Sequence, residues 1–316
     1  MGAAIKSLAL ELGFEACGFA EARPVDKAAA QAYVRWLDDG KNDCMAWAGN
    51  YLDLRFNPQL LFPGAKTVIS LAMNYLPQRL LPSNAPQFAR YAYGKDYHEI
   101  VRDKARDIAA FILEHTGHQC RVCVDSAPML ERYWAQQAGL GFVGLNGMLI
   151  IPRRGSFFFL CEILTTLALP PDEPCKLNCG SCRECERRCP GGALHDGVLD
   201  ARRCLSCQTI ENHDETLPQP VKQAMGNHIY GCDECQLCCP HNRHAQATSI
   251  AEFQPSDDFL NLTIDKILAM NRDEFNRVFR HSPVKRAKLT GVQRNAAIMK
   301  QNKIDSPCNN DKKSQS

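Results

Sequence analysis

Cysteine is the residue type whose spacing says most about the chemistry of this chain, which has 316 residues and 17 cysteines. Four of these cysteines follow the pattern C-x2-C-x2-C-x3-C with a proline directly after the last, namely Cys179, Cys182, Cys185 and Cys189. This spacing binds [4Fe–4S] clusters in proteins that hold two of them, because three thiolates wrap one cluster and the fourth reaches the other. The pattern therefore predicts a second ligand set elsewhere in the chain.

The second set lies further along the chain and again ends at a Cys-Pro pair; it consists of Cys232, Cys235 and Cys239. By the ligand exchange of bacterial ferredoxins, Cys239 completes the first cluster and Cys189 belongs to the second. One ligand of the second cluster is then still missing. From spacing alone it stays open between four cysteines, which are Cys204, Cys207, Cys238 and the less well placed Cys175.

Two other uses of clustered cysteines are less consistent with the sequence. Paired C-x2-C motifs can hold structural zinc, but two proline-terminated runs of matching spacing favour iron–sulfur clusters. Disulfide frameworks are typical of short secreted chains, whereas no signal peptide is recognisable here, so we expect a cytoplasmic protein. The remaining cysteines are expected to be buried small side chains or free thiols: Cys17, Cys44, Cys120, Cys123, Cys161 and Cys308.

Composition and charge restrict the class of protein further. Hydrophobic residues make up 45% of the chain, as in ordinary globular proteins. The most apolar stretch, residues 157–169, contains Glu162 and is too short to span a bilayer, so no membrane partner is expected. Residues 263–316 hold 12 Lys and Arg against 5 Asp and Glu, which is compatible with a polyanionic partner or with a solvated helical surface.

The elements that must position these residues show a mixed α and β pattern, and we expect an α+β fold. Helices are predicted at 5–12, 26–39, 97–116 and 128–137, and strands at 66–74, 120–124, 148–151 and 157–164. The prolines of 170–174 suggest a linker. The predicted units are a domain at 1–170, a cysteine module at 171–245, a short helical region at 246–300 and a disordered tail at 301–316. Two or three short helices are predicted within 263–300.

Residues 139–144 read G-x-G-x-x-G, the form of a dinucleotide-binding fingerprint. That fingerprint must follow a strand and open a helix, whereas this segment is predicted to follow a helix and precede a strand. The dinucleotide interpretation is therefore rejected. A loop beside a flat ligand and a tight turn without a ligand remain as alternatives.

Several segments together resemble one family, the epoxyqueuosine reductases of tRNA queuosine biosynthesis, in a short form without most of their C-terminal helical-repeat domain. The matching segments are both cysteine runs and residues 61–70, 90–98, 125–132, 139–144, 200–206 and 209–211. The resemblance implies a cobalamin-dependent oxidoreductase whose N-terminal domain is a corrinoid-binding α/β sandwich similar to the reductive dehalogenase core, followed by a ferredoxin-like module with two [4Fe–4S] clusters. The clusters would reduce cob(II)alamin to cob(I)alamin, which acts on the epoxide of epoxyqueuosine at the tRNA wobble position.

The resemblance also implies roles for single residues. Asp125 corresponds to the proton donor, and a carboxylic acid under an apolar corrin roof would have a raised pKa. The sequence alone favours a helix N-cap at this position, and the resemblance reverses that preference. Cys204 corresponds to the eighth cluster ligand. The expected cobalamin contacts are Arg90, Tyr97, His98, Asp125, Gly141, Gly144 and Leu149.

The partners implied are the anticodon stem-loop of a queuosine-type tRNA and an external electron donor, with the protein itself a monomer. The family usually has lysine where this chain has Leu145. The expected tRNA-binding cations are Arg280, Lys285, Arg286 and Lys288.

Two rival interpretations of the function are a corrinoid reductase of a small molecule and a non-catalytic two-cluster electron carrier.

Overall fold

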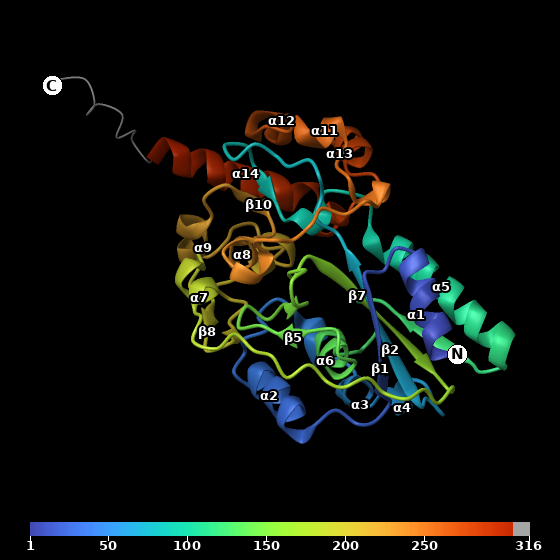
Figure 1. The fold of residues 1–316 in the computed structure, drawn as a ribbon. Helices are drawn as coiled ribbons and strands as arrows, with labels where there is room; N and C mark the ends of the chain where they lie inside the picture. Colours follow the sequence, from blue (N-terminus) through green and yellow to red (C-terminus); the bar gives the residue numbers. More distant parts are fainter. Residues whose placement is uncertain (306–316) are drawn as a thin grey trace.

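A four-stranded antiparallel sheet forms the centre of the N-terminal part of the computed structural model, which describes residues 1–305 (Figure 1). The strands lie in the order β1, β2, β7, β4, with the bounds Ala16–Glu21, Thr67–Asn74, Phe158–Thr165 and Cys120–Cys123. Every residue of β2 is buried. A strand buried on both faces needs a covering layer on each side of the sheet.

Helices supply these two layers. They are α1, α5 and α6, with the bounds Gly2–Glu11, Tyr97–Thr116 and Glu131–Gln137. Ile69 and Leu71 of β2 point to the face that α1 and α5 cover. Val68 points to the opposite face and packs in one cluster with Trp134 of α6. The expected α+β fold with a sandwich of helices around a sheet is confirmed.

Helix α5 is the element that the sequence predicts best, with the expected bounds at both ends. The Asp96 carboxylate accepts a hydrogen bond from the backbone N–H of His98 at 3.0 Å and so caps the helix. Gly117 ends it at a φ of +72°, a conformation that glycine adopts without strain. The buried side of the helix carries Val101, Ala105, Ile108 and Ile112.

Helix α6 begins later than the sequence suggests. The predicted start at Pro128 is wrong, since the helix begins at Glu131 and its N-cap position is Leu130. Asp125 has a φ of +48°, outside the conformation of a capping residue, and its backbone N–H donates to the Glu131 carboxylate. The alternative role of Asp125 as a helix N-cap is therefore excluded.

Short elements connect the sandwich to the rest of the molecule. Four short helical segments follow β1, namely α2 (Lys27–Asp38), the 3-10 turn η1 (Ala46–Gly49), α3 (Leu52–Phe56) and α4 (Pro58–Leu61). The hairpin of β5 (Phe142–Val143) and β6 (Leu149–Ile150) follows the glycine-rich segment. A side chain at Gly141 would meet the Ile150 carbonyl oxygen at 2.2 Å, so this glycine permits a close backbone approach inside a tight turn.

The cysteine module consists of short helices and two-residue or three-residue strands. They are α7 (Glu184–Arg188), β8 (Leu194–His195), β9 (Val198–Leu199), α8 (Leu205–Ile210), α9 (Gln219–Ala224), β10 (His228–Tyr230), α10 (Glu234–Leu237) and η3 (Pro240–Asn242). Such a module has little regular structure of its own. Its stability must come from the parts of the chain that pack on it.

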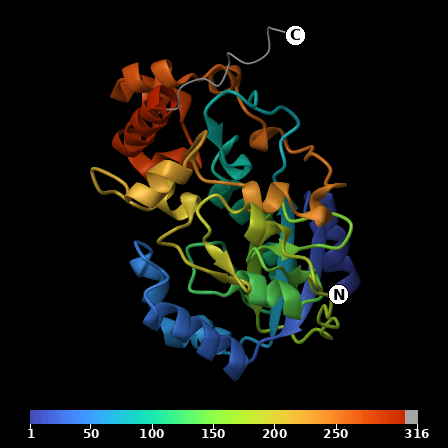
Figure 2. The same ribbon diagram turned by 90° about the vertical axis from the view of Figure 1, so that its left-hand side faces the viewer.

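The C-terminal helices provide that packing. After η4 (Ala251–Phe253) come α11 (Asp257–Leu260), α12 (Ile264–Ala269), α13 (Arg272–Val278), η5 (Pro283–Ala287) and α14 (Lys288–Asp305). They share one hydrophobic core with α8, β10 and the segment 81–93, whose strand β3 (Gln87–Phe88) and neighbouring turn η2 (Arg90–Ala92) lie against β10. Figure 2 shows these helices, in orange and red, next to the teal segment at one end of the molecule.

Two expectations for this region need correction. The helices of 246–300 are not all short, because α14 has 18 residues and extends into the expected tail as far as Asp305; the rest of that tail, 306–316, lies outside the described residues. The hydrophobic cores also do not divide at the predicted domain boundary of residue 170, since residues 81–93 pack in one core with residues of the C-terminal half. Within residues 1–305, no helix is both long and apolar enough to cross a membrane.

Candidate functional site

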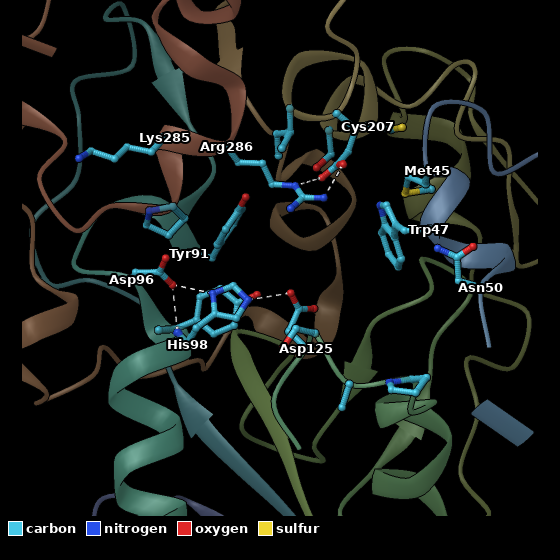
Figure 3. A pocket seen from close by; sticks show the side chains of 18 of the residues that line it. Met45, Trp47, Asn50, Tyr91, Asp96, His98, Asp125, Cys207, Lys285 and Arg286 are labelled. Atoms are coloured by element: carbon cyan, nitrogen blue, oxygen red, sulfur yellow. Dashed lines mark hydrogen bonds and ion pairs between the residues drawn. The ribbon is translucent and has the colours of Figure 1, made fainter. Parts of the chain in front are cut away.

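A cavity of about 680 Å³ lies between the sandwich and the cysteine module (Figure 3). Separate stretches of the chain line it, namely 45–55, 91–98, 125–128, 206–211 and 282–286, together with Tyr230. The loop after β4, the first turn of α5 and helix α8 all face this space. The fold is therefore needed to bring these residues together, and no single motif contains them.

Three polar side chains form a connected chain on one wall of the cavity. His98 Nδ1 lies 2.6 Å from an oxygen of Asp96, and His98 Nε2 lies 2.9 Å from an oxygen of Asp125. The hydrogen bonds to Asp125 and Asp96 raise the pKa of His98 to about 9. At neutral pH the ring is thus an imidazolium, and its Nε2 proton is directed at Asp125.

The carboxylate of Asp125 is stabilised in its ionised form. Burial raises its pKa, but the hydrogen bond and charge of His98 outweigh this, with further help from the Tyr97 hydroxyl and the Arg286 charge, so the pKa lies below its ordinary value. We expected a raised pKa under an apolar roof. The structure instead places the proton on His98, next to the carboxylate.

Glu131 holds the backbone of the Asp125 loop. Its carboxylate accepts the N–H of Asp125 at 2.6 Å, which fixes the left-handed conformation of that residue. Burial and the charge of Asp125 raise the pKa of Glu131 to about 8. Glu131 therefore binds a proton more strongly than an exposed glutamate does, and it is largely protonated at neutral pH.

Positively charged groups face the cavity from the other sides. Arg286 makes a two-point ion pair with Glu211, one contact of which measures 2.7 Å. Arg55 is only 8% exposed, and its Nε has no hydrogen-bond partner among the described residues. A buried, unsatisfied donor in a cavity wall is suited to an anionic or carbonyl group of a ligand.

The first predicted cysteine set lines a second, small cavity, with all four of its members in the wall: Cys179, Cys182, Cys185 and Cys239. Burial and the charges of Cys238 and Cys179 raise the pKa of Cys185 to about 11. Burial and the charges of Cys179 and Cys182 also raise the pKa of Cys239. Thiolates at such close range repel one another. Binding to the positively charged iron–sulfur core of a cluster would relieve this repulsion.

The ligands predicted for the second cluster, Cys189, Cys204, Cys232 and Cys235, also lie near one another in the fold. Burial raises the pKa of Cys235, and so do the charges of its neighbours, which include Cys232, Cys204 and Cys189. Cys204 occupies the N-cap position of α8, and Cys189 accepts a hydrogen bond from the backbone N–H of Ala193 at 3.2 Å. Backbone N–H groups that point at cluster sulfurs are one of the ways in which proteins tune such centres.

The other cysteines of the module make different contacts. The Cys207 sulfur lies 3.2 Å from the sulfur of Cys44, and the Cys238 thiol donates to the carbonyl of Cys235 at 3.7 Å. Leu145, where the family usually has lysine, lines the first cluster cavity and donates its backbone N–H to Cys179 at 3.4 Å. Cys204 as the missing ligand of the second set stays a prediction.

The predicted cobalamin contacts fall into two groups. Tyr97, His98 and Asp125 line the main cavity. The other four lie elsewhere: Arg90 places its guanidinium over the Phe157 ring, Leu149 is part of a core cluster, and Gly141 and Gly144 pack against Ile150. Of the expected tRNA-binding cations, Lys285 and Arg286 are in the cavity wall.

Two predicted sets of four cysteines, together with a cavity that holds a carboxylate–imidazolium chain, are the features of an iron–sulfur oxidoreductase. The family models agree: "Epoxyqueuosine reductase QueG, DUF1730" matches residues 55–126, and "4Fe-4S double cluster binding domain" matches residues 178–242. The epoxyqueuosine reductase of Leadbetterella byssophila is 39% identical over 94% of this chain and 97% of its own length. That of Cyclobacterium marinum is 40% identical over 94% and 96%. The chain belongs to the epoxyqueuosine reductase family.

Solved structures show the same relation. An epoxyqueuosine reductase crystallised with an epoxyqueuosine-modified tRNA-Tyr stem loop has a TM-score of 0.84 and 28% identity, covering 94% of this chain and 80% of that one. The enzyme from Bacillus subtilis, solved with a catalytic aspartate loop swung out of the active site, has a TM-score of 0.87 and 28% identity, covering 96% and 82%. The fold expectation is therefore confirmed, and the protein is an oxidoreductase that carries a two-cluster domain.

Sequence reasoning missed several residues of the site. Arg55 and Trp47 line the cavity although they stand in no chemical motif. Glu131 and Glu211 were only part of the matching segments 125–132 and 209–211 and were given no role. A signal existed for Arg55 alone, since an arginine in a short helix of apolar neighbours is unusual unless it has a role.

Proposed function

We propose that this protein reduces the epoxide of epoxyqueuosine in tRNA to queuosine. One observation carries the proposal: the Asp125–His98 pair faces a cavity whose wall includes Ser206 and Cys207 of α8, the helix whose N-cap is the proposed cluster ligand Cys204. A proton source and an electron source thus border one space. A plain electron carrier would not need such a cavity, and a small-molecule reductase has no support from the family match.

The reaction needs two electrons and two protons, because an epoxide becomes a carbon–carbon double bond and one water molecule. Iron–sulfur clusters deliver electrons one at a time. The proposed ligands of the first cluster are Cys179, Cys182, Cys185 and Cys239, and those of the second are Cys189, Cys204, Cys232 and Cys235. We propose that the second cluster delivers electrons to the cavity, because its ligand Cys204 is the N-cap of α8, and residues of α8 line the cavity wall.

The residues of the cavity fit a corrinoid. Its walls offer the aromatic rings of Trp47, Tyr91 and Tyr97 for a large flat ring, and the unsatisfied Nε of Arg55 for one of its amide or phosphate groups. When bound, cobalamin supplies a strongly reducing cobalt centre for the attack on the epoxide. Tyr97, His98 and Asp125 would lie nearest to it. Arg90, Gly141, Gly144 and Leu149 remain predicted contacts by resemblance only.

The protein residues supply the protons. Opening an epoxide creates negative charge on its oxygen, which must be protonated as it forms. The proton on His98 Nε2 passes to the Asp125 carboxylate at 2.9 Å, and Asp125 gives it to the oxygen. Asp96 keeps the imidazole oriented through Nδ1 at 2.6 Å, so that the ring can take up the next proton at Nε2.

The substrate is proposed to enter from the side that carries Lys285 and Arg286. Their charges would attract the phosphates of an RNA loop, and a relative has been solved with an epoxyqueuosine-modified tRNA stem loop. Arg280 and Lys288 stay further candidates for this surface. We propose a cytoplasmic monomer that takes its electrons from an external donor.

An anaerobic assay tests the proposal. The purified protein, loaded with iron, sulfide and cobalamin and supplied with a chemical reductant, should convert an epoxyqueuosine-containing tRNA stem-loop to queuosine. The Asp125→Asn variant should bind cobalamin and both clusters but react at least about 100-fold more slowly, the usual loss for a general acid. An equal rate for the two proteins, or no cobalamin retained by the wild type, would contradict the proposal.

A further inference from the structure

Cys44 and Cys207 form a sulfur pair outside the two proposed ligand sets. The residues are 163 positions apart in the sequence, and their sulfur atoms lie 3.2 Å apart. Cys207, on α8, is 6% exposed, and Cys44 lies partly buried in the loop between α2 and η1. Two thiols in contact from different parts of the fold can be a redox pair, part of a metal site or packed free thiols.

The backbone around the pair is already held in place. The backbone N–H of Ala201 donates to the Lys41 carbonyl at 2.8 Å, and the indole N–H of Trp36 donates to the Leu199 carbonyl at 2.7 Å. The amide of Gln208, the residue after Cys207, also contacts the Asp43 carboxylate. A disulfide has an S–S length of about 2.05 Å, so the sulfur atoms need to approach by only about 1 Å.

A metal site at this place is less consistent with the geometry. Asp43, Cys44 and Cys207 do come close enough together to hold an ion. However, tetrahedral zinc with Zn–S bonds of about 2.3 Å separates two thiolates by about 3.8 Å, more than the sulfur–sulfur distance here. The Asp43 carboxylate is also already engaged by Gln208.

We propose that Cys44 and Cys207 are a reversible dithiol–disulfide pair, oxidised by exchange with a low-molecular-weight disulfide of the glutathione type. The Cys44 thiolate attacks the small disulfide, which forms a mixed disulfide and releases one small thiol. The Cys207 sulfur then attacks Cys44, closes the protein disulfide and releases the second small thiol. Two electrons pass from the protein thiols to the small disulfide, and excess dithiol reverses the reaction.

The position of the pair gives the disulfide a structural effect. Directly after Cys44, the chain contributes Met45, Trp47 and Tyr51 to the wall of the cavity that Cys207 also lines, and Figure 3 labels Met45, Trp47 and Cys207 around this cavity. The bond would fasten this wall segment to α8. Cys44 is only partly buried, which gives a small disulfide access to the attacking thiol, and Cys207 lines the cavity next to it. The hydrogen bond from Cys207 lowers the pKa of Cys44, which agrees with Cys44 as the attacking thiol.

Redox titration of the full, cluster-loaded protein under anaerobic conditions tests the inference. Samples are equilibrated in buffers of reduced and oxidised glutathione, free thiols are alkylated, and peptides are mapped by mass spectrometry. We expect a linked Cys44–Cys207 peptide that increases with the oxidised fraction and disappears with dithiothreitol, while iron stays at about eight atoms per chain. In Cys207→Ser, glutathione should remain attached to Cys44, because no second thiol can displace it.

A matched control is Cys120→Ser, which changes a partly buried cysteine of β4 and should leave the Cys44–Cys207 link intact. Absence of the linked peptide at every glutathione ratio, with the clusters intact, would overturn the proposal. So would one zinc ion per chain in the wild type that is lost in Cys44→Ser, since the pair would then be a metal site. The outcome does not depend on the substrate of the enzyme.

Discussion

His98 carries the proton that we first expected on the carboxyl of residue 125. Two carboxylates, from Asp96 and Asp125, hold this ring in its charged form. A carboxylate that is ionised at rest can still act as a general acid if a neighbouring group supplies its proton during the reaction. In our proposal, Asp125 is the group that touches the substrate oxygen, and His98 supplies its proton.

The variant His98→Gln tests this division of roles. Glutamine keeps a hydrogen bond to Asp125 but cannot supply a proton at neutral pH. We expect the turnover rate with the tRNA stem-loop to fall by about 10² or more, as for the loss of a general acid–base group. In single-turnover experiments the variant should regain rate as the pH falls and Asp125 itself becomes protonated. A rate equal to that of the wild type at pH 7 would show that His98 holds no essential proton.

The same pair predicts a pH dependence of stability. The pKa of His98 is raised from 6.5 to about 9 by its carboxylate partners, so their stabilising effect is complete below about pH 6.5 and is lost as the pH rises through about 9. The wild type should therefore exceed His98→Gln in free energy of unfolding by about 1 kcal/mol at pH 6, with little difference at pH 10. Anaerobic urea denaturation at the two pH values measures this. A difference that grows with pH would contradict the assigned charges.

At the scale of elements, helix α8 connects the two halves of the chemistry. Its N-cap is Cys204, and within the next two turns Ser206, Cys207 and Ile210 border the cavity. The variant Cys204→Ser should retain about four iron atoms per chain instead of about eight, because the second cluster loses a ligand. Cys207→Ser should keep about eight and serves as the control. Iron and sulfide analysis with EPR of the reduced protein distinguishes the two, and full iron content in Cys204→Ser would refute the ligand assignment.

Helix α14 stabilises the cysteine module by packing against α8 and β10. The side-chain amide of Asn295 is fully buried and donates to the carbonyls of Thr209 at 3.0 Å and Ile229 at 2.8 Å. Asn295→Ala leaves both carbonyls unsatisfied and should lower the free energy of unfolding by about 1–3 kcal/mol. Lys300→Ala, in an exposed ion pair of the same helix, should change it by less than about 1 kcal/mol. Equal effects in denaturant titrations would contradict the role of Asn295.

Local patterns were sufficient for some elements and not for others. Helix α5 could be predicted because its cap, its stop glycine and its buried positions are all encoded within 96–117. The start of α6 could not, because the tertiary contact between Glu131 and the backbone of Asp125 overrides the local signal of Pro128. Seven of the eight predicted cluster cysteines followed from spacing and Cys204 from the family resemblance, whereas Arg55 enters the site only through long-range packing.

At the scale of the whole molecule, the site is formed where two cores meet. The sandwich contributes Asp125 and His98, and the joint core of the segment 81–93, the cysteine module and the C-terminal helices contributes α8 and Arg286. Because residues 81–93 belong to this second core, the chain passes from one half to the other several times. The two halves are thus tied together at the cavity, as expected if electrons arrive from one half and protons from the other.

The central claim is that this cavity is where epoxyqueuosine in tRNA is reduced, with Asp125 as the acid. The most direct measurement is mass spectrometry of nucleosides from the tRNA of a bacterial strain that accumulates epoxyqueuosine because it lacks its own reductase. Expression of the wild-type chain should convert epoxyqueuosine to queuosine, and expression of Asp125→Asn at the same protein level should leave epoxyqueuosine in place. Epoxyqueuosine that persists with the wild type, or queuosine that forms equally with Asp125→Asn, would contradict the account.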